Sequence, residues 1–434
     1  MRYLSTRGQS PAVDAATALF QGLAPDGGLY LPEQLEPLPA AFFQQLADHD
    51  LADNGGRLLA PLLAEVPPPE LRRLLAEALN FPLPLVQLED DLYLLELFHG
   101  PTLAFKDVGA RFMARLMAWF LRRDEPPLTV LTATSGDTGG AVAQAFEGVP
   151  GTRVAVLYPR GRVSPLQERQ FATLGGNVQA LAVDGSFDDC QRLVKAAFSD
   201  PELAGHLRLT SANSINIGRL LPQMLYYLHA LAQLPADAPP ALFITPSGNF
   251  GNLTAGLMAR RLGLPCVGFV AATNANDTVP EYLDSGRFRP RPSVATLSSA
   301  MDVGNPSNFE RILALAGGDL EALRRELHGS RHDDAATREA IREVHRRYGR
   351  ILDPHTAVGY LGWRQARAEV PGRHTGIILA TAHPAKFREH VEPLLGSQLP
   401  LPPALARGLQ LPLRSLPLDP EPAALRRFLL GWVG

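Results

Sequence analysis

The stretch Leu94-Glu-Leu-Phe-His-Gly-Pro-Thr-Leu-Ala-Phe-Lys106-Asp-Val-Gly decides how the rest of the chain is interpreted. It begins within an apolar run from Leu92 to Phe98, which predicts a short buried strand. Turn residues follow, and the apolar spacing then predicts a helix from about Asp107 to Arg123. Lys106 thus lies at a strand-to-helix junction among apolar neighbours, where lost hydration lowers the pKa of its amine. Such a neutral amine is a nucleophile, so the stretch predicts a Schiff-base lysine.

Lysine is rare in this chain. Lys106, Lys195 and Lys386 are the only lysines among 41 lysines and arginines, so the other 38 positive side chains are arginines. A guanidinium stays protonated and cannot form an imine, whereas an amine can. Chance is the simpler explanation for Lys195, but the context of Lys106 favours a chemical role.

The composition narrows the class of protein. A length of 434 residues suggests two or three domains, and 46% hydrophobic with 20% charged residues is ordinary for a globular enzyme. A net charge of −3 gives no general attraction to nucleic acid or to anionic membranes. Cys190 and Cys266 have no partner spacing, which argues against disulfides and cysteine metal sites. Neither a signal peptide nor a membrane-spanning run is recognisable, so a cytoplasmic protein is expected.

From Leu92 onward, strands and helices alternate. This alternation predicts an α/β fold with parallel sheets that are covered on both faces. Helical patterns also cover 40–47, 69–79, 304–329 and 333–349, and the Leu- and Pro-rich chain beyond Gly396 is expected to be a tail packed on the surface. Parallel sheets bind ligands beyond the carboxyl ends of their strands. Strands are expected at 128–133, 153–158, 179–183, 241–245, 267–271 and 377–381.

The segment Ser247-Gly-Asn-Phe-Gly-Asn252 lies between a predicted strand and a predicted helix. Glycines let backbone N–H groups close on an anion, and a helix N-terminus adds a favourable dipole. The spacing matches neither the dinucleotide fingerprint nor a Walker loop. A phosphate cradle and a plain tight turn are both compatible with this segment taken alone.

Two further junctions carry polar side chains. Thr134-Ser-Gly-Asp-Thr-Gly-Gly140 could bind a carboxylate or phosphate, or could simply cap a helix. Asn213-Ser-Ile-Asn-Ile-Gly-Arg219 could bind a phosphate through Arg219, although a surface arginine beside a capped helix is simpler when taken alone. Thr381 ends a buried strand, and its hydroxyl can bond a ring nitrogen without forcing a proton onto it. An imine lysine, a phosphate loop and this hydroxyl together describe a pyridoxal phosphate site.

Five motifs make the chain similar to a known family. His99-Gly-Pro-Thr-Leu-Ala-Phe-Lys106-Asp, Thr132-Ala-Thr-Ser-Gly-Asp-Thr-Gly, Ser211-Ala-Asn-Ser-Ile-Asn-Ile, Pro246-Ser-Gly-Asn-Phe-Gly and Thr381-Ala-His-Pro-Ala-Lys-Phe387 resemble the threonine synthases of the bacterial and fungal type. The resemblance runs from about residue 1 to residue 430 in one order. It implies the fold of the tryptophan-synthase β-like (fold-type II) pyridoxal phosphate enzymes. It also implies conversion of O-phospho-L-homoserine and water to L-threonine and phosphate by γ-elimination and β-addition.

The resemblance also implies roles for individual residues. Lys106 would hold the pyridoxal 5'-phosphate as a Schiff base and then move protons at Cα and Cβ of the substrate. Asp137 lies where related enzymes often have asparagine, and a carboxylate beside the ring's phenolate oxygen is repelled unless one of them carries a proton. The cofactor phosphate would be wrapped by Gly248, Asn249, Phe250, Gly251 and Asn252, and its pyridine nitrogen would face Thr381. Ser135, Asp137 and Thr138 would meet the substrate carboxylate or the hydroxyl side of the cofactor, and Thr102 would also bind substrate. The substrate phosphate would be bound by Asn213, Ser214 and Arg219.

The chain is expected to comprise an N-terminal accessory domain (1–90), a catalytic region with the lysine and a smaller mobile domain (91–230), a larger cofactor-binding domain (231–396) and a C-terminal tail (397–434). The segment around 105–205 is expected to move toward the cofactor loop when substrate binds. The expected protein is a monomer or homodimer. Two alternatives stay open: a phospho-lyase of the same fold that performs simple elimination, and a non-catalytic nucleotide-binding module.

Overall fold

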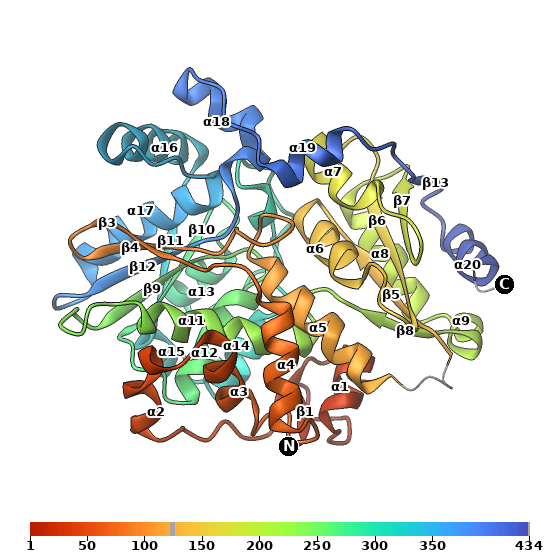
Figure 1. The fold of residues 1–434 in the computed structure, drawn as a ribbon, viewed down its shortest axis with the longest axis horizontal. Coiled ribbons are helices and arrows are strands. Elements are labelled where there is room, and N and C mark those ends of the chain that lie inside the picture. Colours follow the sequence, from red (N-terminus) through yellow and green to blue (C-terminus); the bar gives the residue numbers. More distant parts are fainter. Residues whose placement is uncertain (122–125, 433–434) are drawn as a thin grey trace.

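The computed structural model describes residues 1–121 and 126–432. Two sheets lie side by side, and a helical N-terminal region adjoins them at the bottom of the view (Figure 1). None of the helices in these described ranges has the length and hydropathy that a bilayer crossing requires.

The larger sheet has six strands in the order β11-β10-β9-β12-β4-β3, and only the edge strand β3 is antiparallel. The strand predicted before Lys106 is β4, which pairs in parallel with β12 so that Tyr93 lies opposite Ile377. Its carboxyl end therefore lies beside that of β12. The strands are β3 (Leu85–Glu89), β4 (Leu92–Glu96), β9 (Ala241–Pro246), β10 (Gly268–Thr273), β11 (Leu327–Arg331) and β12 (Thr375–Ala380).

Both faces of this sheet are buried, which explains why its central strands are continuous apolar runs. Ile244 and Ile378 belong to one buried cluster, whereas their neighbours Phe243 and Ile377 belong to another. Helices cover the first face with α17 (Pro354–Glu369) and α16 (Asp334–Tyr348), and α13 (Thr278–Ser285) lies against β10 and β11. The second cluster includes residues of α11 (Met224–Ala232), α12 (Gly251–Arg261) and α14 (Phe309–Leu315).

The smaller sheet is parallel throughout, with the order β13-β7-β6-β5-β8. Its strands are β5 (Leu128–Ala133), β6 (Thr152–Pro159), β7 (Val178–Val183), β8 (Arg208–Ser211) and β13 (Leu416–Leu418). Its helices are α6 (Asp137–Phe146), α7 (Pro165–Ala172), α8 (Phe187–Phe198) and α9 (Pro201–His206). Leu131 and Leu157 pack with α8, whereas Val130 and Val156 join the large cluster on the other face.

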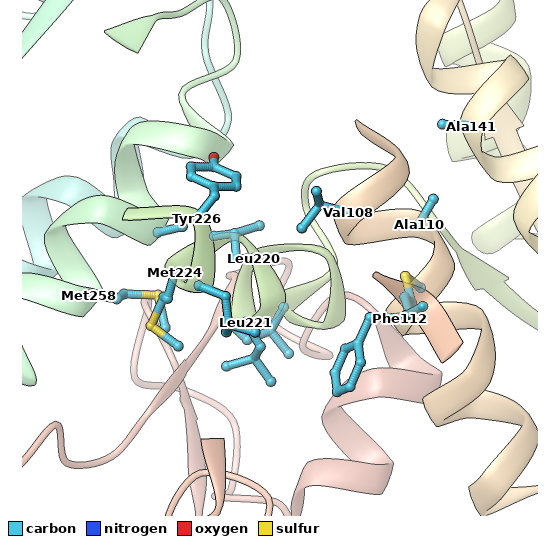
Figure 2. Packing of buried hydrophobic residues seen from close by; sticks show 14 of the residues in the cluster. Val108, Ala110, Phe112, Ala141, Leu220, Leu221, Met224, Tyr226 and Met258 are labelled. Carbon is cyan, nitrogen blue, oxygen red and sulfur yellow. The ribbon is translucent and has the colours of Figure 1, made fainter. Parts of the chain in front are cut away.

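Helix α5 (Lys106–Phe120) connects the two sheets and begins at the lysine itself. Figure 2 shows Ala110 of α5 on the side toward Ala141, and Val108 and Phe112 on the side toward Leu220, Leu221, Met224 and Tyr226. These four residues belong to α10 (Ile217–Leu220), η2 (Leu221–Gln223) and α11. Because three of its first seven residues pack into this core, the start of α5 is fixed. The helix was predicted to extend to about Arg123, which lies outside the described residues.

The N-terminal region packs against α5 and α11. It contains an antiparallel pair, β1 (Tyr3–Ser5) and β2 (Tyr30–Pro32), and mostly short helices. The helices are α1 (Ala15–Gln21), α2 (Ala40–Gln44), η1 (Leu46–Asp48), α3 (Leu51–Leu59) and α4 (Pro68–Ala78). Both helices predicted here, at 40–47 and 69–79, are present within a few residues.

The prediction of helix throughout 304–329 is wrong. Helix α14 ends before Gly317 and Gly318, whose positive φ angles of 62° and 75° break the helix. After the short helix α15 (Leu320–Arg324), the chain enters β11, which pairs with β10 at the sheet edge. The sequence of β11, Leu-His-Gly-Ser-Arg, lacks an apolar alternation because the strand is only half covered.

The chain beyond Gly396 is more than a surface tail. After η4 (Pro384–Phe387), α18 (Arg388–Leu395) and α19 (Pro403–Leu409), it adds β13 to the edge of the smaller sheet. The last helix, α20 (Pro422–Gly431), buries Leu425 and Leu429 against the cluster that contains α8. The C-terminal segment therefore returns from the larger sheet and completes the smaller one (Figure 1).

Candidate active site

Lys106 reaches the end of the larger sheet because the turn before it pairs with the segment after β12. Leu97 N donates to Ala380 O at 3.0 Å, Phe105 N to Thr381 O at 2.9 Å, and His383 N to Leu103 O at 3.0 Å. These bonds place Lys106 beside the segment 381–386, a juxtaposition of two motifs nearly 280 residues apart in the chain. The strand-to-helix junction predicted for Lys106 is confirmed.

The turn is held by Thr102 and Asp107. The N–H and hydroxyl of Thr102 donate to the two oxygens of Asp107 at 2.9 and 2.7 Å. Gly100 allows this contact, since a Cβ there would lie 2.4 Å from Asp107 Oδ2. Burial raises the pKa of Asp107, although the bonds from Thr102 oppose the rise. Thr102, predicted to bind substrate, is fully buried and has its polar hydrogens engaged by this carboxylate.

Three groups set the charge around the amine of Lys106. Asp137 Oδ2 lies 4.0 Å from Nζ, and Asp137 Oδ1 pairs with Lys386 Nζ at 2.6 Å. Gln167 Nε2 donates to the same Oδ1 at 2.8 Å. Burial lowers the pKa of Lys106 to about 8; Asp137 opposes this, and Lys386 and Arg219 add to it. The amine is therefore far closer to its neutral, nucleophilic form than a lysine in water.

Asp137 is held ionised despite its burial. Burial alone would raise the pKa of its carboxyl, but the nearby charges of Lys386 and Lys106 and the bonds from Lys386 and Gln167 lower it overall. The residue begins α6, directly after Gly136 with a φ of 146°. A Cβ at Gly136 would lie 2.6 Å from the side chain of Gln167, so this position requires glycine for both space and backbone conformation.

The loop after β9, for which a phosphate cradle and a plain tight turn were both predicted, has an unusual backbone. Phe250 adopts a left-handed conformation with a φ of 61°, and Gly248 has Met301 Cα 2.6 Å from the position of a Cβ. Within the described parts of the chain, the backbone N–H groups from Gly248 to Gly251 have no protein acceptor. Unpaired N–H groups next to a helix start form an anion site.

The two asparagines of this loop support it through protein contacts. Asn249 Nδ2 donates to Ser214 Oγ at 2.6 Å, and Asn249 Oδ1 accepts from Ser307 N at 2.6 Å. Asn252 Nδ2 donates to Pro246 O at 2.9 Å and its Oδ1 accepts from Leu253 N at 3.0 Å. Their side chains thus hold the loop open, and the backbone is left for a ligand.

Asn308 is a site residue that the sequence interpretation missed. Its Nδ2 is buried and has no partner among the described residues, and it lies 3.6 Å from the position of a Cβ on Gly251. Its Oδ1 accepts from the buried Arg311 at 2.7 Å, which turns the amide N–H groups toward the cradle. An unpartnered donor beside unpaired backbone N–H groups fits a phosphate. The nearby sequence Asn-Pro-Ser-Asn gives only a turn signal.

The junction after β5 is organised differently. Thr134 Oγ1 accepts from Gly136 N at 2.9 Å and from Gly139 N at 2.8 Å, so two amides of this junction are bound by a side chain of the protein itself. Ser135 is exposed and Thr138 is half-buried, which leaves their hydroxyls at the rim.

The segment 213–219 lies between the two junctions. Asn213 Oδ1 is buried and unpartnered within the described residues, and Ser214 contacts Asn249 as above. Arg219, for which a surface position was the simpler alternative, is only 3% exposed. Its Nη1 donates to Ala212 O at 2.7 Å, and its Nε lies 2.9 Å from where a Cβ on Gly109 would be. Burial lowers its pKa to about 10, against the attraction of Asp107.

Thr381 lies directly after β12 and is buried beside the start of α5. His383 follows it, with its ring edge-on to Phe98 at 5.4 Å between centroids. Burial lowers the pKa of His383, which favours a neutral ring. The structure thus brings Lys106, Asp137 and Thr381 to one place where both sheets meet, with the cradle after β9 on the larger sheet. No cluster of acidic, histidine or cysteine side chains suited to a metal ion occurs in 1–121 or 126–432.

These residues fit pyridoxal phosphate: an amine of lowered pKa, a cradle of unpaired N–H groups and a hydroxyl at a strand end. Comparison with known proteins gives the same cofactor. Residues 77–381 match the family model of pyridoxal-phosphate dependent enzymes, residues 2–79 the threonine synthase N terminus, and residues 356–429 the threonine synthase C-terminal region.

Similar proteins cover the whole chain. The threonine synthase of Serratia marcescens is 48% identical over 433 residues, 99% of each chain. That of Escherichia coli K12 is 45% identical over 99% of this chain and 100% of its own. A crystal structure of Escherichia coli threonine synthase superposes with a TM-score of 0.93 at 44% identity, covering 100% of both chains. The pyridoxal-phosphate-bound threonine synthase of Brucella melitensis gives 0.92 at 38% identity, covering 99% of this chain and 98% of that one. This chain therefore belongs to the threonine synthase family of pyridoxal-phosphate-dependent enzymes.

Proposed function

We propose that this protein converts O-phospho-L-homoserine and water to L-threonine and inorganic phosphate, the last step of threonine biosynthesis. The observation that carries the proposal is the buried amine of Lys106, with a pKa of about 8, which lies beside the ionised Asp137 in a site that also contains the loop of unpaired N–H groups after β9. A nucleotide-binding module would need no such amine, so this observation also sets that alternative aside. The full-length similarity to threonine synthases supports the same conclusion.

The cofactor would be held by residues of the larger sheet and α5. We assign its covalent attachment to Lys106 and its phosphate to the backbone N–H groups of Gly248, Asn249, Phe250, Gly251 and Asn252. The amide of Asn308 would add one donor. The hydroxyl of Thr381 would face the pyridine nitrogen. When bound, pyridoxal phosphate supplies an electron sink that lets protons leave the carbon atoms next to the amino group.

The substrate would lie between the cradle and the junction after β5. We assign its carboxylate to the rim hydroxyls of Ser135 and Thr138, and its phosphate to Asn213, Ser214 and Arg219. Arg219 is buried with an unpartnered Nε in the described structure, so a dianion that reaches it would gain a charge-assisted hydrogen bond. Thr102 would contribute to substrate binding indirectly, because its hydroxyl donates to Asp107 and so fixes the turn before Lys106.

Lys106 would also move protons. Once its amine is free of the cofactor it can take a proton from Cα of the substrate, return protons during the later steps, and act near neutral pH because its pKa is about 8. Water has to stay away until phosphate has left Cγ, and then has to add at Cβ. We propose that the smaller sheet moves toward the cradle for this purpose, within the segment around 105–205. Equal distances between Thr134–Thr138 and Gly248–Gly251 in crystals with and without a substrate analogue would contradict that movement.

The domain arrangement is also part of the proposal. Four regions would act together. They are an accessory region (1–90), a region with the lysine and the mobile sheet (91–230), a cofactor-binding region (231–396) and a C-terminal segment (397–434). We further propose a cytoplasmic monomer or homodimer, because both Cys190 and Cys266 are free thiols, as is usual in reducing compartments. Light scattering of the purified protein determines the oligomeric state.

The test is a product assay with O-phospho-L-homoserine. Purified protein should release L-threonine and phosphate in equal amounts, and the Lys106→Ala variant should release neither. Lys195→Ala is the matched control, because Lys195 is an exposed lysine of α8. Release of 2-oxobutanoate in place of threonine would select the phospho-lyase alternative and overturn the proposal.

A further inference from the structure

Two of the three lysines in this chain face the same carboxylate. Lys386 Nζ lies 2.6 Å from Asp137 Oδ1, and Lys106 Nζ lies 4.0 Å from Asp137 Oδ2. The third, Lys195, is exposed on α8. Because arginine supplies the positive charge almost everywhere else, the lysine at 386 calls for an explanation of its own. An ammonium is a compact charge that fits where a guanidinium fork would be too large.

Lys386 is fixed in a fully buried position. It lies in η4, and its Nζ also donates to the carbonyl of Thr102 at 2.7 Å. Asp137 comes from α6 of the smaller sheet and receives a second bond from Gln167 in α7. The ion pair therefore joins the segment after the larger sheet to the first turn of a helix in the smaller one. Its third contact is the carbonyl of Thr102, in the turn that presents Lys106.

The ion pair of Lys386 and Asp137 determines the electrostatic potential at the amine of Lys106. Three charged groups face this amine: Asp137 from α6, Lys386 from η4 and Arg219 from α10. Lys386 in turn faces Asp137, Asp107 of α5 and His383. An isolated Asp137 would favour the charged ammonium of Lys106, and a positive partner within hydrogen-bond distance of the same carboxylate opposes that effect.

We propose that Lys386 is a positioning residue of the cofactor site: its ammonium holds Asp137 ionised and in place, and by offsetting the field of that carboxylate it keeps the amine of Lys106 available in its neutral form. The proposal also accounts for an aspartate at this position. Paired with Lys386, Asp137 adds no net charge beside the phenolate oxygen of a bound cofactor. The inference rests on the proposed function of Lys106.

The test measures how the reactivity of Lys106 depends on pH in the full-length chain after removal of the cofactor with hydroxylamine. Acetic anhydride at trace amounts acetylates neutral amines, and mass spectrometry of the peptides reports each lysine separately. Lys195 serves as an internal reference in every sample. Near-ultraviolet circular dichroism verifies that each variant remains folded.

Lys386→Met should shift the pH at which acetylation of Lys106 is half-maximal, its midpoint, upward by about one unit. At a pH below the midpoints of both proteins, labelling of Lys106 should then be roughly tenfold lower in the variant than in the parent. Asp137→Asn should shift the midpoint downward. Opposite shifts from the two ends of one ion pair separate an electrostatic role from a merely structural one, because loss of packing gives no such change of sign.

The double variant Asp137→Asn/Lys386→Met keeps the test decisive if Lys386→Met fails to fold, since it leaves no unpaired charge in the pair. Its midpoint should lie near that of the parent and above that of Asp137→Asn. Equal midpoints in the double variant and Asp137→Asn, or an unchanged midpoint in a folded Lys386→Met, would overturn the proposal. The labelling needs no turnover, so its failure is distinguishable from a failure to form threonine.

Discussion

The junctions after β5 and β9 have similar sequences but are built in opposite ways. Both connect a parallel strand to a helix through a short loop of small polar residues. After β9, asparagine side chains bind the protein and the backbone N–H groups are left without protein acceptors in the described structure. After β5, the hydroxyl of Thr134 accepts two of the backbone N–H groups, and the helix begins with the buried charge of Asp137.

The difference teaches that a small-residue loop before a helix does not define its own ligand. In the loop after β9, side chains hold the scaffold and the backbone is available to an anion. In the loop after β5, the hydroxyl of Thr134 binds the N–H groups of Gly136 and Gly139, and a charged side chain reaches Lys106. The first arrangement suits a permanently held phosphate, and the second suits control of the amine and of the substrate that approaches it.

Removing the lysine between the two junctions should have the largest effect. We expect Lys106→Ala to lower threonine formation on the order of 10³-fold or more, because covalent attachment and proton transfer are both lost. The absorbance band of the bound imine, at about 410–420 nm, should disappear as well. Lys195→Ala should retain both. A Lys106→Ala variant that keeps the band would place the cofactor on another lysine.

The second-largest effect is expected from one added methyl group in the loop after β9. Gly248→Ala would place Cβ 2.6 Å from Met301 Cα, and a backbone atom cannot yield as a flexible side chain does. Overpacking of about 1–3 kcal/mol predicts roughly 5- to 150-fold weaker cofactor binding, measured by fluorescence titration with pyridoxal phosphate. Gly56→Ala in α3 is the matched control, because no atom lies within 4 Å of its added Cβ. Equal affinity in the two variants would show that the cradle does not hold the cofactor.

The pH dependence of acetylation at Lys106 tests whether the junction after β5 affects the pKa of this amine. Its pKa is lowered to about 8, so the neutral amine is the minor form below that pH and the major form above it. Acetylation of Lys106 in the cofactor-free chain should therefore rise about tenfold per pH unit up to pH 8 and then level off. A rise that continues to about pH 10, where a lysine in water titrates, would contradict the lowered pKa.

The smallest effect is expected from Thr134→Val, which removes the acceptor for the N–H groups of Gly136 and Gly139. Leaving two buried donors unpaired should destabilise the protein by about 1–3 kcal/mol in urea unfolding. KM for the substrate should rise a few-fold while the imine band stays intact. Thr132→Val is the control, because the Thr132 hydroxyl is buried without a partner in the described structure and its loss should be neutral or stabilising. A loss of the band in Thr134→Val would mean that this junction holds the cofactor too.

Much of the fold could be predicted from local patterns. The strand at 128–133 was predicted with the observed bounds, and several other strands to within one or two residues, because strands buried on both faces are continuous apolar runs. The edge strands β11 and β13 were missed because they are not such continuous apolar runs. β11 is interrupted by Gly329, and the three residues of β13 contain Pro417, so neither has an apolar pattern of its own.

The candidate site was predictable where a motif carries its own chemistry, as at Lys106 and in the loop 247–252. It was not predictable where a residue acts through a partner far away in the chain. Nothing next to Asn308 indicates that Arg311 orients its amide toward the cradle. The pairing of Lys386 with Asp137 joins residues about 250 positions apart, and only the scarcity of lysine gave a hint.

The buried guanidinium of Arg311 has a consequence for the order in which the protein is made. It donates to the carbonyl of Tyr30 in β2 at 3.0 Å and to those of Ser214 and Ile215 at 3.2 and 2.7 Å, besides orienting Asn308. Tyr30 is translated early, and Ser214 and Ile215 are translated in the middle of synthesis. All three need the later side chain of Arg311 to complete their hydrogen bonds. Neither the N-terminal strand nor the loop 213–219 can reach its final hydrogen bonding on the ribosome before Arg311 has left the exit tunnel. The nascent chain consequently acquires a complete cofactor site only near the end of its synthesis, and Lys386, still later in the sequence, is the last of its charges to arrive.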